Sequence, residues 1–370
     1  MIDNSYNPIV PFITCKYYSN YPISQEIINL QNTYNADPIS YRKVLLKDAK
    51  KSLMVHPHPY AEELRDLKYT TQQLSLEIPN TKFKELENTP FKYIDKLEDL
   101  EVLAKELNEV TEFAVDLEHH SYRSYLGITC LMQLSTRNCD YIVDVISLRK
   151  HMHVLQEVFA NPKIVKVFHG ADCDIKWLQR DFAIYVLNMF DTGQASRVLG
   201  YSSYSLAYLL KNICNVTANK QYQLADWRIR PLPDEMLHYA REDTHYLLYI
   251  YDTLRRRLIG LAKVRSAKDP LTYLNIVLRQ SKDICAVVYQ KPELKSYHYF
   301  MTISHHAASL NKLQRSVLKL MLKLRDYIAR LEDDSVSYIC PTTVIVNIAK
   351  AVPVSLFVIG RQNMLNLKSA

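Results

Sequence analysis

The stretch that decides the fold is Phe113-Ala-Val-Asp-Leu-Glu118, an apolar run that closes on two acids. Its aromatic and β-branched residues predict a strand near 112–117. Asp116 and Glu118 are two positions apart, so both side chains project from the same face of the sheet. Two acids on a half-buried face repel and desolvate each other, and a bound cation would relieve both problems. A strand that simply runs into a solvated turn explains the same pattern.

On both sides of this strand the chain has the strand and helix patterns of an α/β domain. The first three strands are joined by connections too short for crossover helices, so they should pair antiparallel. Later strands alternate with helices, which predicts a mixed sheet. Asp95-Lys-Leu-Glu98 resembles a capping box and predicts a helix to about Asn108. The other expected elements are strands near 127–135, 140–145, 164–168 and 184–188, and helices at 151–160, 173–181, 192–199, 204–213 and 233–258.

Composition narrows the function classes without choosing one. The 370 residues are 48% hydrophobic, enough for more than one domain. A net charge of +7 and a pI near 8.8 fit a polyanionic partner only weakly. The seven cysteines form no zinc spacing and predict reduced thiols in the cytosol or nucleus. No signal peptide is expected, and the most apolar stretch, 344–359, contains Lys350 and Pro353, which argues against a membrane span.

The flanking regions predict further organisation. Residues 1–90 hold eight of the fifteen prolines, so they are expected to form an extended arm that wraps the next domain, with plain disorder as the alternative. Residues 91–260 hold the α/β patterns, and 261–304 are interpreted as a linker with a helix. Residues 305–370 predict a small all-α module, with helices at 310–332, near 342–351 and after Pro353. The first of these has apolar positions at 313, 317, 320, 321, 324, 328 and 331.

A third acid lies at the start of the helix expected at 173–181. It follows a tight turn that Gly170 permits. Acids are favoured at helix N-termini, so one of Asp172 and Asp174 is expected to cap the helix and the other to be available for chemistry. Sequence geometry does not choose between them.

The fourth acid, Asp243, falls in the middle of the apolar stripe of the helix expected at 233–258. An acid that faces a core must be paired, protonated or bound to a metal. Arg241 or Lys220 as a buried partner is the simple alternative to a metal.

Tyr239 and His238, which both precede Asp243 in the sequence, are the two candidates for positioning a water. Tyr239 lies four positions earlier and therefore on the same side of the helix. His238 lies five positions earlier, which on a continuous helix turns its side chain about 140° away. Pro233-Asp-Glu235 is a good helix start and favours a continuous helix, and hence Tyr239.

Together these segments resemble the DEDD superfamily of 3′–5′ exonucleases, tyrosine branch. They are most similar to RNase D and to the RNase D-like catalytic subunit of the eukaryotic nuclear RNA exosome. The most specific stretches are Asp116-Leu-Glu-His-His120 and Ala225-Asp-Trp-Arg-Ile-Arg-Pro-Leu232. The resemblance covers roughly 95–260 and implies an RNase H-like exonuclease domain with a mixed sheet. More loosely, 305–370 is similar to an HRDC domain, here a shortened one.

The resemblance assigns roles to residues of this chain. It selects Asp174 over Asp172, and Tyr239 as the residue that would orient the attacking water. Trp177 is three positions after Asp174 and on the same helical side, although packing under the sheet is as common a role for tryptophan. The implied ligands of two Mg²⁺ or Mn²⁺ ions are Asp116, Glu118, Asp174 and Asp243, and the implied substrate contacts are His119, Trp177, Lys220 and Gln223.

The implied activity is removal of nucleoside 5′-monophosphates from single-stranded RNA 3′ ends, in rRNA and snoRNA trimming and in RNA surveillance. The implied partners are the exosome core and its cofactors, with no membrane, in the nucleus and its nucleolus, and with a monomeric catalytic region. A DNA 3′–5′ exonuclease is one alternative, since recognition of the ribose 2′-hydroxyl cannot be read from these residues. A non-catalytic RNA-binding adaptor is another, but all four acids and the tyrosine are present.

Overall fold

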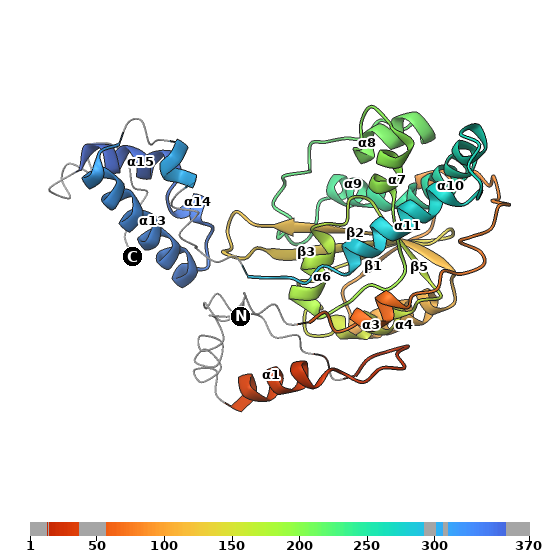
Figure 1. Cartoon of the computed structure of the whole chain (residues 1–370), viewed down its shortest axis with the longest axis horizontal. Coiled ribbons are helices and arrows are strands. Elements are labelled where there is room, and N and C mark those ends of the chain that lie inside the picture. Colours follow the sequence, from red (N-terminus) through yellow and green to blue (C-terminus); the bar gives the residue numbers. More distant parts are fainter. Residues whose placement is uncertain (1–12, 14, 37–56, 292–300, 306–309, 353–370) are drawn as a thin grey trace. The chain divides into compact units, whose positions relative to one another are not determined.

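The computed structural model describes residue 13 and residues 15–36, 57–291, 301–305 and 310–352. Within these ranges the chain divides into two compact units, both drawn in Figure 1. The sheet unit comprises the described residues up to 119 and residues 129–289. The helical unit comprises 120–128 and the described residues from 290 onward. Across the described ranges, no helix combines the length and the apolar character needed to cross a bilayer.

A six-stranded sheet in the order β1-β4-β3-β2-β5-β6 forms the centre of the sheet unit (Figure 1). Strands β3 and β4 pair antiparallel, whereas β1 with β4, β2 with β5 and β5 with β6 pair parallel. The predicted mixed sheet is therefore confirmed. The strands are β1 (Phe91–Ile94), β2 (Glu112–His120), β3 (Ile128–Ser135), β4 (Asp140–Val143), β5 (Val165–Phe168) and β6 (Met189–Asp191).

Two strand predictions were wrong. Strand β1 was missed, because four residues beside a proline give little pattern. The last strand was expected at 184–188, but β6 begins at Met189. Residues 184–187 are buried without joining the sheet, and Asn188 adopts a left-handed φ of 59° before β6. A short apolar run marks burial, and burial alone does not distinguish a strand from a packed loop.

Alternation along β2 decides what each face of the sheet carries. The odd-numbered residues of 113–117 belong to one hydrophobic core, and Ala114 belongs to another. Because strand side chains alternate, Asp116 and Glu118 lie on the Ala114 side. The apolar residues of β2 thus anchor the strand from both faces and fix the direction of its two acids.

Helices supply both cores. Helices α4, α5 and α6 contribute to the core around Phe113, and α7, α10 and α11 to the core around Ala114. The predicted capping box is wrong, since the N-cap of α4 is Lys96 without a side-chain bond. The helix expected at 233–258 is interrupted at Tyr246. The helices are α4 (Leu97–Asn108), η2 (Met152–Leu155), α5 (Gln156–Ala160), α6 (Asp174–Phe182), α7 (Thr192–Leu199), α8 (Leu206–Leu209), η3 (Leu210–Cys214), α9 (Asp234–His245), α10 (Leu247–Val264) and α11 (Thr272–Cys285).

The segment expected to be a linker with a helix, 261–304, contains the helix α11, and its residues up to 289 belong to the sheet unit. Helix α11 buries Leu274, Val277 and Leu278 completely in the core around Ala114. The Asp191 N–H of β6 donates to Ser281 Oγ at 2.9 Å, which fixes α11 to the sheet.

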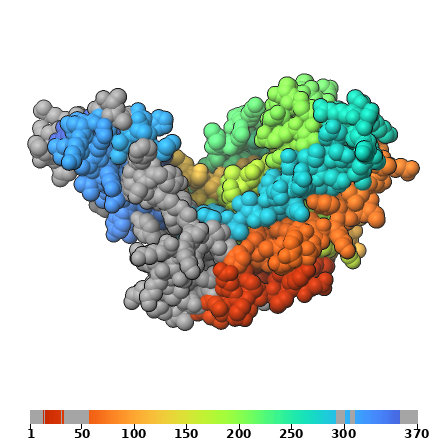
Figure 2. Space-filling model, in the orientation of Figure 1, coloured from red at the N-terminus to blue at the C-terminus, as the bar shows by residue number. Residues whose placement is uncertain are grey.

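The described part of the N-terminal arm, 1–90, contains more helix than its prolines indicated: α1 (Gln25–Ala36), α3 (Ala61–Arg65) and η1 (Leu86–Asn88). Arg255 Nη2 of α10 donates to the main-chain oxygens of Gln72 and Gln73, each at 2.7 Å. In Figure 2 the orange segment that includes these two residues lies beside the teal surface of α10 and α11. Residues 1–12, 14 and 37–56 of the arm lie outside the described residues.

The helical unit consists of α13 (Lys312–Glu332), α14 (Val336–Ile339) and α15 (Thr342–Ala351), packed through Leu318, Leu322 and Ile345. The predicted apolar stripe of α13 coincides only in part with its core face. Val317 and Met321 of the stripe pack against the core, whereas its leucines at 313, 320, 324 and 331 are 59%, 67%, 50% and 67% exposed. Apolar residues occupy two faces of α13, so periodicity alone did not separate them. The helix expected after Pro353 lies outside the described residues.

The loop between β2 and β3 packs within the helical unit. Arg123 Nε donates to Asp334 at 2.6 Å, and Tyr125 donates to Asp326 at 2.6 Å. These polar contacts join 120–128 to α13 and to the residues that follow its C-terminus.

Candidate metal centre

Three acids from two elements converge beside the sheet. Asp116 and Glu118 project from β2, and Asp243 projects from α9. Carboxylate oxygens of all three lie within 4.8 Å of one another. Glu118 is buried, while Asp116 and Asp243 keep part of their surface at the solvent. The spacing by two on a strand and the acid in the stripe of α9 therefore lead to one site.

Asp174 belongs to the same electrostatic cluster, although it is not among those three. It begins α6, after a turn in which Gly170 has a left-handed φ of 68°. Burial and then Asp116 raise the pKa of Asp174. The expectation that one acid of this segment caps α6 was wrong, because the N-cap is Cys173 and no side chain bonds there. The carboxylate of Asp174 is thus left without a capping role.

Burial and mutual repulsion dominate the electrostatics of these four acids. Burial raises the pKa of Asp116 to about 7. Burial also raises the pKa of Glu118 well above its usual value, and Asp116, Asp243 and Asp174 raise it further. The pKa of Asp243 is raised by burial, by Asp116 and by Glu242.

The cluster has the chemistry of a divalent-cation site. Among the described residues, no ion pair joins any of the four acids to a lysine or arginine. Carboxylate oxygens are the ligands that hard divalent cations prefer. A cation in their midst would remove the repulsion that the protein itself leaves uncompensated. The residues present therefore fit a bound divalent metal.

Tyr239 faces this cluster from one turn earlier on α9. Burial raises the pKa of its phenol, and the charges of Asp243, Glu118 and Asp116 raise it further, in that order. Its ring lies 5.9 Å from the ring of the buried Trp227. A phenol held protonated beside carboxylates is suited to hydrogen bonding with a water.

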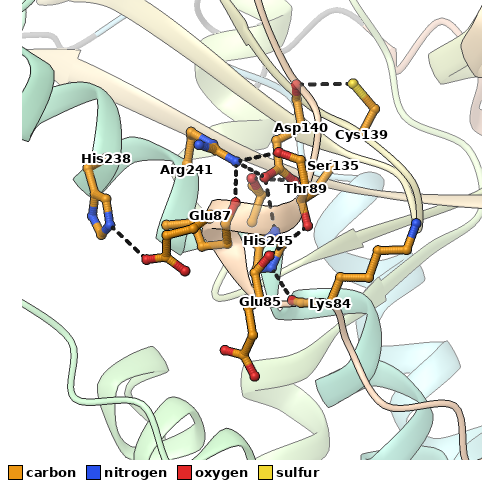
Figure 3. Close-up of polar contacts among 12 residues, drawn as sticks. Lys84, Glu85, Glu87, Thr89, Ser135, Cys139, Asp140, His238, Arg241 and His245 are labelled. Atoms are coloured by element: carbon orange, nitrogen blue, oxygen red, sulfur yellow. Dashed lines mark hydrogen bonds and ion pairs between the residues drawn. The ribbon is translucent and has the colours of Figure 1, made fainter.

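His238 points elsewhere. Its side chain is 52% exposed and lies 3.8 Å from Glu242 and 4.0 Å from Glu87 (Figure 3). The geometry thus puts Tyr239, and not His238, beside the acids.

A separate set of contacts fixes α9 against β4 and against the segment 84–86, which precedes β1 (Figure 3). Arg241 Nη2 donates to Asp140 Oδ2 at 3.0 Å and to the Leu86 oxygen at 2.9 Å. His245 Nδ1 lies 2.9 Å from Asp140 Oδ2, and its Nε2 lies 2.8 Å from the Lys84 oxygen. Arg241 is therefore engaged by Asp140, which removes the simple explanation that it neutralises Asp243.

The rings of His119 and Trp177 form a stack, with centroids 4.1 Å apart and planes within 2° of parallel. Arg180 Nη2 lies 3.2 Å from His119 Nε2. Although burial raises the pKa of Asp181, bonds and charge from Arg180, with Arg149, lower it to about 2. This ionised partner holds Arg180, and Arg180 in turn holds the ring of His119.

Lys220 and Gln223 lie on an exposed turn in which Gln223 N–H donates to the Lys220 oxygen at 3.3 Å. Their predicted contact with substrate stays a prediction. Lys220 is exposed, so it is not the buried partner considered for Asp243.

The sequence interpretation assigned no role to two buried residues here, Gln133 and Trp227. Gln133 Nε2 donates to Glu118 Oε1 at 3.4 Å. The available signal was a glutamine inside the apolar run Leu131-Met-Gln-Leu134. A polar residue in a buried strand calls for a partner, but the sequence does not name it.

Comparison with known proteins relates this geometry to a family. A family model described as a 3′-5′ exonuclease matches residues 91–259. "Protein RRP6-like 2" of Arabidopsis thaliana is 52% identical over 272 residues, which are 73% of this chain and 31% of that protein. "Exosome complex component 10" of Homo sapiens is 42% identical over 362 residues, which are 95% of this chain and 40% of that protein. This chain thus spans well under half the length of both relatives.

This chain matches one solved structure over most of that structure's length. The crystal structure of the catalytic core of RRP6 from Trypanosoma brucei is 39% identical, with a TM-score of 0.78. The match includes 84% of this chain and 83% of that one. Escherichia coli RNase D shares the fold, with a TM-score of 0.56 at 20% identity. With its sheet order, its converging acids and these matches, the chain belongs to the 3′–5′ exonuclease family that includes the RRP6 catalytic core.

Proposed function

We propose that this chain is a metal-dependent 3′–5′ exoribonuclease that releases nucleoside 5′-monophosphates from RNA 3′ ends. The observation that carries the proposal is the cluster of Asp116, Glu118 and Asp243, with oxygens within 4.8 Å and no ion pair to a lysine or arginine in the part of the chain that the structure describes. Such a cluster is unfavourable alone and is stabilised by the ions that phosphodiester hydrolysis uses.

The proposed ligands of two Mg²⁺ or Mn²⁺ ions are Asp116, Glu118, Asp174 and Asp243. Asp174 joins this set because its charge raises the pKa of Glu118, and the charge of Asp116 in turn raises the pKa of Asp174. When bound, such ions supply an activated water and neutralise the leaving 3′ oxygen. The protein's part is to hold four carboxylates in place from β2, α6 and α9. Strand β2 and helix α6 are anchored in the hydrophobic cores, and α9 is held by the contacts of Arg241 and His245 with Asp140.

Other residues act on the water and on the RNA. Tyr239, whose phenol stays protonated beside the acids, orients the attacking water. The stacked rings of His119 and Trp177 offer a flat surface for the terminal base. Lys220 and Gln223, on their exposed turn, contact the approaching strand.

The relatives support RNA as the substrate and the exosome as the partner. The human relative is named as a component of the exosome complex, and we extend that association to this chain. The proposal includes action in the nucleus and nucleolus, in rRNA and snoRNA trimming and in RNA surveillance. All seven cysteines are free, which fits a reducing compartment.

The test offers 5′-labelled single-stranded RNA and matching DNA to the full chain, with Mg²⁺ or with EDTA. The expected result is an RNA ladder that shortens from the 3′ end and is lost with EDTA and in Asp174→Asn. Asp172→Asn is the matched control, because this exposed acid lies two residues away and should leave the rate unchanged. Faster loss of DNA would overturn the RNA assignment, and binding without shortening would indicate an adaptor.

A further inference from the structure

Gln133 is fully buried on β3, the neighbour of β2 in the sheet. Its amide nitrogen, Nε2, donates to Glu118 Oε1 at 3.4 Å. Its amide oxygen, Oε1, is also buried and has no hydrogen-bond partner among the described residues. An orphaned buried acceptor destabilises the folded state, so a native protein rarely keeps one without a reason.

The direction of this amide follows from the chemistry of Glu118. A carboxylate bound to a cation only accepts hydrogen bonds, so the amide nitrogen of Gln133 must face it. The two polar atoms of an amide diverge from one carbon, and the carbonyl oxygen must then face away from Glu118. Because it shares one carbon with the donating nitrogen, the oxygen still lies close to the Glu118 carboxylate, buried and with its lone pairs unused.

The waters of a divalent ion would supply the missing donor. Mg²⁺ keeps several waters even when carboxylates bind it, and each such water presents hydrogens to nearby acceptors. Groups outside the first coordination sphere orient both the ligands and these waters. A neutral amide suits this place, because it adds an acceptor without adding a fifth negative charge to the cluster.

We propose that Gln133 is a positioning residue of the metal centre: its NH₂ group holds Glu118, and its carbonyl oxygen accepts a hydrogen bond from a metal-bound water. This inference rests on the proposed function. It assigns a task to each half of the side chain, and it explains why a glutamine occupies a strand position where its neighbours are apolar.

The test replaces Gln133 with methionine, which has a similar length and no hydrogen-bonding amide. In EDTA, Gln133→Met should unfold at the same temperature as wild type or higher, because the orphaned acceptor is gone. Its affinity for Mn²⁺ by calorimetry should fall by about 10-fold or more, the usual effect of losing such a partner. In Mg²⁺, kcat on RNA should fall while KM changes little.

A matched control is available on α11. Gln280 Oε1 is also buried without a partner among the described residues. Gln280→Met should therefore change stability in EDTA in the same direction and leave the Mn²⁺ affinity unchanged. If both variants weaken Mn²⁺ binding equally, the effect is general and the assignment to Gln133 fails.

Other results would also overturn the proposal. A lower melting temperature in EDTA with unchanged Mn²⁺ affinity would make Gln133 a core residue only. Should Gln133→Met not fold, Gln133→Leu repeats the test, and failure of both to fold also assigns Gln133 to the core. If the wild-type protein binds no Mn²⁺ and shortens no RNA, the proposed function itself is refuted. If the wild type binds Mn²⁺ and shortens RNA, and Gln133→Met does both equally well, only this inference is refuted.

Discussion

Helix α9 takes part in two groups of acids that the protein treats in opposite ways. Asp140 is 1% exposed. Its carboxylate oxygens form hydrogen bonds with the side chains of Arg241, His245 and Ser135, at 3.0, 2.9 and 2.7 Å. The neighbouring group, around Asp116 and Asp243, receives no lysine or arginine among the described residues. Within the described residues, the fold can therefore pair a buried acid with basic side chains, and it leaves this cluster without them.

Two other buried acids follow the Asp140 pattern, whereas Asp191 is satisfied by the backbone N–H groups of Ala171 and Gln194. Asp144 binds Arg230 at 2.7 Å, and Asp181 binds Arg180 at 2.8 Å. Burying a charge is costly unless it is paired, so pairing is the ordinary solution. In the carboxylate cluster the unfavourable free energy of burying the charges is not offset by such pairing, which indicates that its cation comes from solution.

The largest expected effect comes from removing one acid of the unpaired group. Asp243→Asn should lower kcat by about 10³-fold or more, about 4 kcal/mol in the barrier, because a metal ligand is lost. In EDTA the same variant should be as stable as wild type or more stable, because one repelling charge has gone. Cleavage of labelled RNA and thermal unfolding measure the two effects.

A loss of stability in EDTA similar to that expected for Asp140 would contradict this contrast. It would show that Asp243 has a stabilising partner in the protein. Asn also keeps the size of the side chain, so a change in packing does not confuse the comparison.

The paired acid should behave in the opposite manner. Asp140→Ala leaves Arg241 and His245 without their carboxylate and should lower the free energy of unfolding by about 3 kcal/mol or more in EDTA. Urea unfolding followed by circular dichroism measures it. Unchanged stability would mean that the main-chain oxygens of Leu86 and Lys84 suffice for Arg241 and His245.

The next largest effect is expected at Tyr239, which is compared with His238 as the residue that positions the water. Tyr239→Phe should lower kcat by about 10²-fold with little change in KM, the usual scale for a residue that positions or moves a proton. His238→Ala should keep most of the activity, because His238 faces Glu242 and Glu87. The reverse ranking would give the task to His238.

The acids of the site were predictable because their patterns are local. The spacing of Asp116 and Glu118 follows from strand alternation, and Asp243 stands out in the stripe of its helix. Asp174 was different, because a helix start explains an acid as well as a metal does. Only the fold shows Cys173 at the N-cap and Asp174 within the field of Asp116.

What the sequence could not supply was pairing between distant segments. Gln133 matters because β3 lies beside β2, and no local pattern states that neighbour. The engagement of Arg241 by Asp140 depends on β4 in the same way. Likewise, the leucines of α13 repeat on two faces, and only the packing against Ile345 shows which face is the core.

The smallest effect expected is a pH dependence that only the unpaired group should produce. The pKa of Asp116 is raised from 3.8 to about 7 in the folded protein, and the pKa values of Glu118, Asp174 and Asp243 shift in the same direction. Between these limits the folded state binds more protons than the unfolded state, so without metal the stability falls as pH rises. Ions replace those protons, so stabilisation by Mn²⁺ should grow over the same range. The gap between melting temperatures in Mn²⁺ and in EDTA should therefore widen by several degrees from about pH 5 to about pH 7.5, at about 2–4 °C per kcal/mol. Asp243→Asn should flatten this trend, whereas a gap that stays constant in wild type would show that the cluster holds no such protons.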